Sequence, residues 1–256
     1  MNALHVPYYS EAAGSDGLVV FIHGFMGSPR QFDRLAETAH QHSRSAAALL
    51  LPGHGGSVKD FSAGTMERWQ EHVNDEIERL SRYNKSIWLV GHSMGCLLAI
   101  NAAVRYSEYV RGLLLIACPL KLKWLTLRNL RIRVLPVTGR KTNPMKKEYL
   151  SGCSVKRTPD FLWRFTKPLS ELKKLMAVAR DNLPNISAPV TAVFMPADEV
   201  VSIDSLEILK SGLSDATLKQ IILYDSLHAY FPEHEFASIE HELTEFLNEG
   251  NYSEAL

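Results

Sequence analysis

The sequence predicts an α/β fold in which a mostly parallel central sheet is flanked by helices and carries one small basic cap insertion. Six apolar runs rich in β-branched residues alternate with longer amphipathic stretches, which is the pattern of consecutive βαβ units. One stretch in the second half of the chain interrupts this alternation and is rich in Lys and Arg. The six runs lie near 18–22, 46–51, 86–91, 111–116, 189–195 and 218–224.

Helix signals occupy the segments between these runs. Ser28, Pro29 and Gln31 form an N-cap, a first-turn proline and a capping-box partner, so a helix should begin immediately after the loop that follows the first run. Between 66 and 80, apolar residues recur at three- and four-residue spacing, which predicts a helix packed on the sheet. These residues are Met66, Trp69, Val73, Ile77 and Leu80.

The periodic pattern stops after Cys118-Pro119 and resumes near Pro168. The chain therefore divides into a core and an inserted cap. At the start of the cap, a helical face and a two-residue alternation can both be fitted, and we favour the helix. Its face would comprise Leu120, Trp124, Leu127, Leu130 and Val134. We assign residues 1–120 and 168–256 to the core and residues 121–167 to the cap.

Charge is distributed unevenly along a chain that is neutral as a whole. Residues 121–180 contain 16 Lys and Arg but only three acidic residues. Such a segment can be a solvated surface that pairs with an acidic body, a contact with an anionic membrane, or an attractor of acidic substrates. The basic residues carry no recognised nucleic-acid-binding motif, so we expect no nucleic-acid partner.

Composition limits the class of protein further. A chain of 256 residues with 46% hydrophobic content can form one well-buried domain. No apolar run has the length of a membrane span and the first 17 residues lack a signal-peptide core, so we expect a cytoplasmic protein. Cys96, Cys118 and Cys153 are odd in number and lack paired spacing, which argues against a disulfide framework.

The strongest chemical motif is Gly-His-Ser-Met-Gly at residues 91–95, between an apolar run and a helix-favouring stretch. A serine on a sharp strand-to-helix turn has an exposed hydroxyl, and the flanking glycines let strand and helix approach closely. Ser93 is therefore the candidate nucleophile. The alternative is a serine that only caps the following helix.

A nucleophilic serine needs a base and an acid. His228 and Asp198 each lie just past the end of an apolar run, where an open parallel sheet places its functional residues. We therefore expect His228 to be the base and Asp198 the acid. Glu199, Asp204 and Asp225 are near enough in sequence to compete with Asp198 for that role.

Two backbone amides are the candidate oxyanion donors. One belongs to Met94, the residue after the nucleophile, and the other to Phe25, in a glycine-bearing loop after the first run. We interpret His23 and His92, which flank these turns, as hydrogen-bonding residues that support the site, and His54 as a residue that orders a loop. The three histidines have no carboxylate or thiolate at ligand spacing beside them, so we expect neither a metal nor a cofactor.

With these motifs the chain resembles the α/β-hydrolase superfamily, and in particular the short-cap bacterial carboxylesterases and monoacylglycerol lipases. The resemblance implies the α/β-hydrolase fold and a serine carboxylester hydrolase that works through an acyl-enzyme. The chain departs from the family at Cys96, where relatives often have glycine, and in its basic cap. The matching segments are His23-Gly24-Phe25, Gly53-His54-Gly55, residues 91–95 and 172–189, the turn at Asp198 and the loop at His228.

The expected partner is a small-molecule ester with an apolar part, and we expect its acyl chain to lie under the cap. Packing within the cap is the alternative role for the residues that would contact it. Acyl transfer to an alcohol other than water, and a non-catalytic ligand-binding protein on the same scaffold, remain alternative functions. The candidate pocket residues are Leu122, Leu125, Leu127, Phe161, Leu162, Trp163 and Phe165.

Overall fold

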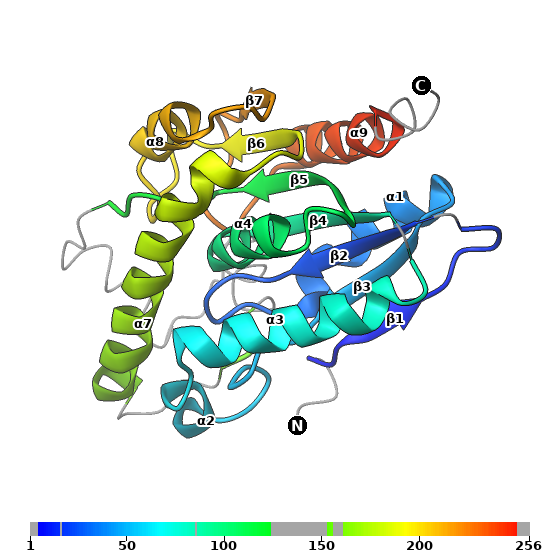
Figure 1. The fold of residues 1–256 in the computed structure, drawn as a ribbon. Coiled ribbons are helices and arrows are strands. Elements are labelled where there is room, and N and C mark those ends of the chain that lie inside the picture. Colours follow the sequence, from blue (N-terminus) through cyan, green and yellow to red (C-terminus); the bar gives the residue numbers. More distant parts are fainter. Residues whose placement is uncertain (1–4, 16, 85, 124–152, 156–160, 250–256) are drawn as a thin grey trace.

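A computed structural model describes residues 5–15, 17–84, 86–123, 153–155 and 161–249. Its centre is a seven-stranded sheet with the order β1-β3-β2-β4-β5-β6-β7 (Figure 1). The pair of β1 and β3 is antiparallel and every other neighbouring pair is parallel, which confirms the predicted fold class. The strands are β1 (Tyr8–Ser10), β2 (Leu18–Ile22), β3 (Ser45–Leu49), β4 (Ile87–His92), β5 (Val110–Ile116), β6 (Val190–Phe194) and β7 (Leu218–Ile222).

The six predicted strands are all present, with shifts of one or two residues at their ends. Every residue of β2, β3, β4 and β6 is buried, as expected for strands covered on both faces. The sequence did not predict β1. This edge strand is short and only partly buried, so it lacks the apolar run by which the other strands are recognised.

Helices cover both faces of the sheet. Helices α1 and α9 contact each other on one face, and α4 packs between α3 and α7 on the other (Figure 1). None of the helices in the described part of the chain is both long and apolar enough to cross a membrane. The helices are η1 (Pro29–Phe32), α1 (Asp33–Gln41), α2 (Val58–Ser62), α3 (Met66–Ser81), α4 (Met94–Arg105), α7 (Phe161–Asn182), η2 (Leu183–Asn185), α8 (Asp204–Gly212) and α9 (Glu233–Glu249).

Both predicted helices are present, and one of them differs from the prediction in its first turn. The stripe on α3 is confirmed, because Trp69, Val73, Ile77 and Leu80 are buried in the core and Met66 packs against it. The helix after the first loop starts where predicted, but its first turn is the 3₁₀ helix η1. The Ser28 hydroxyl accepts a hydrogen bond from the Arg30 amide and contacts His5, and it forms no capping box with Gln31.

The start of the insertion differs from the sequence prediction. Residues 120–123 are not helical, because Leu122 forms an antiparallel bridge with Val201 and the Lys123 amide donates to Val200 O at 2.8 Å. This long-range pairing outweighs the local helical pattern. Residues 124–152 lie outside the described part of the chain. Helix α7 runs without a break past the expected boundary at Pro168, so the cap at 121–167 stays a prediction.

Candidate active site

Ser93 lies on a strained turn between β4 and α4. Its backbone has φ 53° and ψ −122°, in a region that costs a residue with a side chain about 1 to 3 kcal/mol. The turn is possible because its glycines are small: a Cβ on Gly91 would lie 2.6 Å from Cys96 Cα, and one on Gly95 would lie 1.9 Å from Ile22 O. Ser93 makes no side-chain capping bond to α4, so the capping alternative is not supported.

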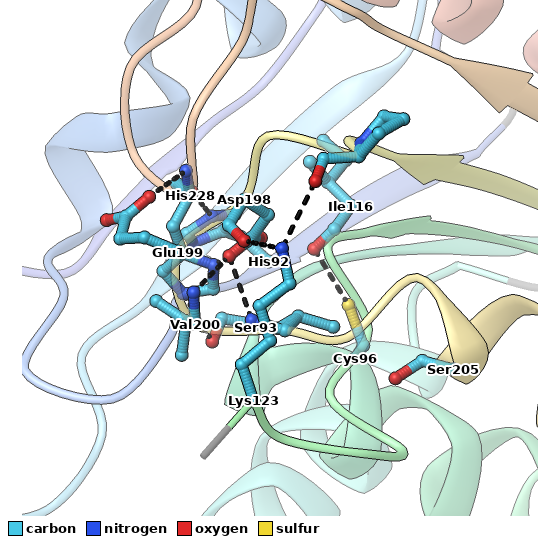
Figure 2. A network of polar contacts seen from close by, with 12 residues as sticks. His92, Ser93, Cys96, Ile116, Lys123, Asp198, Glu199, Val200, Ser205 and His228 are labelled. Atoms are coloured by element: carbon cyan, nitrogen blue, oxygen red, sulfur yellow. Dashed lines mark hydrogen bonds and ion pairs between the residues drawn. The ribbon is translucent and has the colours of Figure 1, made fainter. Parts of the chain in front are cut away.

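The structure brings the three residues expected to form the catalytic set into one chain of hydrogen bonds. His228 Nε2 lies 3.0 Å from Ser93 Oγ, and His228 Nδ1 lies 2.8 Å from Asp198 Oδ2. All three side chains are buried and point toward one another (Figure 2). Because the carboxylate fixes the hydrogen on Nδ1, Nε2 is left to accept the serine proton.

Asp198 is held as an ionised group. Its Oδ1 accepts hydrogen bonds from the Val200 and Val201 amides at 2.6 and 2.8 Å. Burial alone would raise the pKa of Asp198, but the attraction of His228 and these hydrogen bonds outweigh it and lower the pKa below its usual value. The turn therefore presents a carboxylate to the imidazole.

The acids that competed with Asp198 in the sequence have other partners. Glu199 Oε2 accepts a hydrogen bond from the His228 backbone N–H at 3.2 Å. Asp204 pairs with Lys121 at 2.6 Å, and Asp225 pairs with His234 at 3.2 Å. Of the four acids, Asp198 is the one whose carboxylate hydrogen-bonds the His228 ring.

His92 supports the His228 loop from the other side. Its Nε2 donates to His228 O at 2.8 Å, while its Nδ1 is buried without a hydrogen-bond partner among the described residues. Burial, reinforced by repulsion from His228, lowers the pKa of His92 to about 4, so the ring is neutral at pH 7. This agrees with the role expected from the sequence.

Lys123 was not recognised from the sequence, although it lies beside the acid turn (Figure 2). Its ammonium group donates to Pro196 O at 3.1 Å and to Asp198 O at 2.5 Å. The main chain of Lys123 and its neighbour Leu122 pair with residues 200 and 201, as described above. The first residues of the insertion are thus attached to the turn that carries Asp198.

The loop at 23–27 brings backbone amides to Ser93. A Cβ on Gly24 would lie 2.9 Å from Ser93 Cβ, so the loop lies directly against the serine. Gly24 O accepts hydrogen bonds from the Gly27 amide at 2.8 Å and from His23 Nδ1 at 2.9 Å. Because a trans peptide points its N–H opposite its C=O, these bonds also set the direction of the Phe25 N–H.

The amides of Phe25 and Met94 are the two expected oxyanion donors. Among the hydrogen bonds of the described residues, neither the Phe25 amide nor the Met94 amide donates to a protein atom. Met94 is the first residue of α4, where backbone N–H groups are left free and favour negative charge. Both amides can therefore bind a substrate oxygen.

A cavity of about 630 Å³ opens beside Ser93 and His228. Its volume is within the range of about 300 to 1,000 Å³ that is usual for small-molecule sites. At one side, Arg34 pairs with Glu233 and Glu240 and lies 4.2 Å above the ring of Phe236, which gives the cavity a charged edge. The lining comprises residues 24–27, 30–35 and 228–233 together with His92, Ser93, Ile116, Cys153, Phe236 and Ile239.

Three of the seven predicted pocket residues, Leu122, Trp163 and Phe165, have described side chains, and none of these three is among the residues that line this cavity. Leu122 pairs with Val201, Trp163 is 85% exposed on α7, and Phe165 packs on the ring of Phe25 at 5.3 Å. Leu125 and Leu127 lie outside the described residues, as do the side chains of Phe161 and Leu162.

Apolar side chains of the described lining come from η1, from the loop after His228 and from the start of α9. Phe32, Phe231, Phe236 and Ile239 are examples, and sequence reasoning missed all four. A signal was present, because Phe231 and Phe236 follow closely on the candidate base His228.

One group of potential metal ligands occurs among the described residues. Atoms of Asp225, His234 and Glu235 lie within 4.8 Å of one another at the surface. The Glu235 carboxylate already accepts hydrogen bonds from the Tyr224 and Asp225 amides, and Asp225 is paired with His234. These contacts tie the three groups to the loop before His228.

Comparison with known proteins agrees with this geometry. Residues 19–237 match the model of the Alpha/beta hydrolase family. A thermostable monoacylglycerol lipase of Bacillus sp. (strain H-257) is 26% identical over 226 residues, which cover 87% of this chain and 86% of the lipase.

Two solved structures share the fold. One, from work on the metagenome-derived lipolytic enzymes LipS and LipT, has a TM-score of 0.79 at 22% identity and covers 97% of this chain and 99% of that chain. The other, a monoacylglycerol lipase of Paleococcus ferrophilus, has a TM-score of 0.69 at 21% identity and covers 96% and 98%. Because the family model spans most of the sequence and the strand order and serine turn agree with it, the chain belongs to the alpha/beta hydrolase family.

Proposed function

We propose that the protein is a serine carboxylester hydrolase that uses Ser93, His228 and Asp198 as its catalytic triad. The observation that carries the proposal is the continuous hydrogen-bonded chain from the Ser93 hydroxyl through the His228 ring to the Asp198 carboxylate, at 3.0 and 2.8 Å. Among the described residues, the Phe25 and Met94 amides donate to no protein atom, and a cavity opens beside Ser93. Each part needed for acyl transfer is therefore supplied by this chain.

The reaction follows from these positions. His228 Nε2 takes the proton of Ser93 Oγ as that oxygen bonds to the ester carbonyl carbon, and Asp198 stabilises the imidazolium that forms. The Phe25 and Met94 amides bind the oxyanion. His228 then gives the proton to the leaving alcohol as the ester C–O bond breaks, which leaves an acyl-enzyme. Water, activated by the same histidine, cleaves it to release the acid and restore Ser93.

The substrate class follows from the cavity and from the relatives. The aromatic rings of Phe25, Phe32, Phe231 and Phe236 suit an apolar chain, whereas the ion pairs of Arg34 suit a polar group at the edge. A similar protein is named a monoacylglycerol lipase. We therefore propose small esters with one apolar part, with monoacylglycerols as the first class to test.

Labelling with a fluorophosphonate, followed by mass analysis, tests the nucleophile. Modification at Ser93, lost in Ser93→Ala, is expected. A folded wild-type protein that remains unlabelled would instead support a non-catalytic ligand-binding protein on this scaffold.

A panel of p-nitrophenyl esters and monoacylglycerols of increasing chain length then defines the substrate. Adding a second alcohol to the same assay separates hydrolysis from acyl transfer, because transfer gives a new ester in place of the free acid.

A second proposal concerns contact with anionic membranes. The buried face of α7 packs on the core through residues such as Leu172 and Leu175, while Trp163, Lys167 and Lys173 are exposed. A helix face with tryptophan and lysine suits the surface of a bilayer that contains anionic lipid. Lys121 and Lys123, by contrast, already bind Asp204 and the acid turn, which supports the alternative that part of the basic segment pairs with the body.

The membrane proposal predicts co-sedimentation with phosphatidylserine vesicles. Replacing Lys167 and Lys173 with Glu and Trp163 with Ala should abolish it without loss of activity on a soluble ester. Binding that survives these changes would contradict the proposed surface.

A further inference from the structure

We propose that His54 is a positioning residue for the oxyanion loop: by accepting the hydrogen bond of the Met26 N–H, it holds the turn at 24–27, and with it the Phe25 N–H, in place beside Ser93. The inference rests on the proposed function, since it assigns His54 a part in the reaction of Ser93. It explains a contact between residues 28 positions apart in the sequence.

The turn itself has a demanding backbone. The Gly27 amide donates to Gly24 O at 2.8 Å, which makes Phe25 and Met26 the two central residues of a four-residue turn. Met26 has a φ of 63°, whereas Phe25 is not among the described residues with positive φ. This combination is a type II turn, whose third position favours glycine because a Cβ is disfavoured there. Met26 therefore needs support from outside the turn.

That support reaches Met26 on both sides. Its N–H donates to His54 Nε2 at 3.1 Å, and its C=O accepts from the Ser154 amide at 2.9 Å. A type I turn suits a residue with a side chain better, but it turns the central peptide over and would take the Met26 N–H away from His54. The hydrogen bond to His54 thus selects the type II form.

His54 is in the right state to accept this bond. Its Nδ1 lies 3.3 Å from Pro52 O, which places the ring hydrogen on Nδ1 and leaves a lone pair on Nε2. Burial lowers the pKa of His54 to about 4, so Nε2 remains an acceptor at neutral pH. The rings of His23 and Phe61 pack edge-on against His54 at 4.7 and 5.2 Å and fix its plane.

The turn geometry bears directly on the chemistry. Gly24, which precedes Phe25, lies so close to the serine that a Cβ on Gly24 would be 2.9 Å from Ser93 Cβ. An oxyanion donor contributes only where its hydrogen meets the oxygen formed in the transition state. A loop that has lost its bond to His54 can relax and shift as a whole, which displaces the Phe25 N–H, weakens transition-state binding and leaves binding of the intact ester almost unaffected.

Two substitutions separate this role from simple packing. His54→Leu removes the acceptor, whereas His54→Gln can restore it through its side-chain oxygen. We would measure kcat and KM for p-nitrophenyl butyrate and the inhibition constants of a trifluoromethyl ketone and the matching methyl ketone. Ser93 adds to the carbonyl of the trifluoromethyl ketone and forms an oxyanion, whereas the methyl ketone binds mainly without reacting. Active sites are counted with a fluorophosphonate, so that loss of folded protein does not enter the rates.

For His54→Leu we expect kcat and the affinity for the trifluoromethyl ketone to fall together by about 10- to 100-fold, with KM and methyl ketone binding nearly unchanged. His54→Gln should recover most of the loss. In a Met26→Gly background, where glycine adopts positive φ freely, His54→Leu should cost several-fold less. The control is His40→Gln, which removes a histidine bonded to Ser10 and should leave activity unchanged.

Two results would overturn the inference. One is an equal loss of affinity for both ketones in His54→Leu, and the other is a loss that is the same with Met26 and in the Met26→Gly background. Failure of the proposed function is distinguishable from these, since wild-type protein would then neither hydrolyse esters nor react with the fluorophosphonate at Ser93.

Discussion

Glu199 holds the main chain of His228, with its carboxylate 3.2 Å from the His228 backbone nitrogen. The neighbouring Asp198 holds the ring of the same histidine, and His92 donates to its carbonyl oxygen at 2.8 Å. Two consecutive acids on one turn therefore fix different parts of the candidate base. From the sequence, Glu199 was an alternative to Asp198 as the acid that contacts the base. In the structure Asp198 contacts the ring of His228 and Glu199 contacts its backbone N–H.

Removing the Glu199 carboxylate should weaken the placement of His228 without removing the base. A hydrogen bond to a charged group contributes about 1.5 to 3 kcal/mol, and Glu199 is partly exposed, so we expect Glu199→Ala to lower kcat/KM by about 5- to 10-fold. Glu199→Gln should lose less, because its amide oxygen can accept the same bond. Steady-state kinetics on a soluble ester check this, and an Ala variant with wild-type kcat/KM would contradict it.

Neutralising Asp198 should be far more damaging. An amide in its place no longer stabilises the imidazolium and can hold the wrong tautomer, which in a comparable triad costs about 10⁴ in kcat. We expect Asp198→Asn to lose about 10³- to 10⁴-fold in kcat while its far-ultraviolet circular dichroism stays native. The matched control is Asp204→Asn, which loses only the exposed pair with Lys121. Equal losses in the two variants would show that Asp198 is not the acid of the triad.

We expect that no side chain can be accommodated at Gly95, because strand β2 lies too close to it. An added Cβ would lie 1.9 Å from Ile22 O, a backbone atom of strand β2, so strand and helix would have to separate. We expect Gly95→Ala to lower the melting temperature sharply or prevent folding.

Gly14→Ala provides the contrast, because Gly14 has a φ of 68° with no atom within 4 Å of an added Cβ. Its expected cost is about 1 to 2 kcal/mol from backbone conformation alone. Thermal denaturation of the two variants, compared with wild type, measures the difference. Similar melting temperatures would refute the argument from close packing.

Stability should fall as the solution is acidified below neutral pH. Burial lowers the pKa values of His54 and His92 to about 4, whereas an unfolded histidine titrates near about 6.5. Between these values the unfolded state binds more protons than the folded state, so the free energy of unfolding decreases as pH falls, by up to about 1.4 kcal/mol per pH unit for each histidine. The contribution of Asp198, whose pKa is lowered from that of an ordinary aspartate, is lost only in stronger acid.

Urea denaturation at pH 7, 6 and 5 tests this linkage. In His54→Gln, the free energy of unfolding should depend less steeply on pH, because the contribution of one buried histidine is removed. His40→Gln serves as the comparison. A free energy of unfolding that does not change over this range in wild-type protein would contradict the expectation.

Most of the framework could be read from the sequence because it depends on local patterns. Buried parallel strands need continuous apolar runs, and a strained serine turn needs glycine on both sides. Strands β2 and β4 and the turn at Ser93 are therefore recognisable from the sequence. The order of Ser93, Asp198 and His228 at strand ends then indicated which side chains could meet. Distinguishing Asp198 from Glu199 required coordinates, because both lie on the same turn.

The cavity and the start of the insertion depend on contacts that no local pattern reveals. Phe231 and Phe236 lie on a polar, amphipathic segment, where an aromatic residue can face solvent, the core or a ligand with the same spacing. Residues 120–123 begin the segment for which we favoured a helix, but Leu122 pairs with Val201, 79 positions later in the chain. Long-range pairing of this kind competes with local propensity, and its outcome is decided only in the folded molecule.

The predicted cap, residues 121–167, contacts both the turn that carries Asp198 and the loop that carries Phe25. Lys123 binds the carbonyl groups beside Asp198, and Ser154 binds Met26 in the loop that carries Phe25. A chimera that exchanges residues 121–167 for those of a relative would therefore disturb turnover as well as substrate choice. Grafts that retain residues 120–123 and 153–155 of this chain, and replace only what lies between, should change selectivity at constant catalytic power.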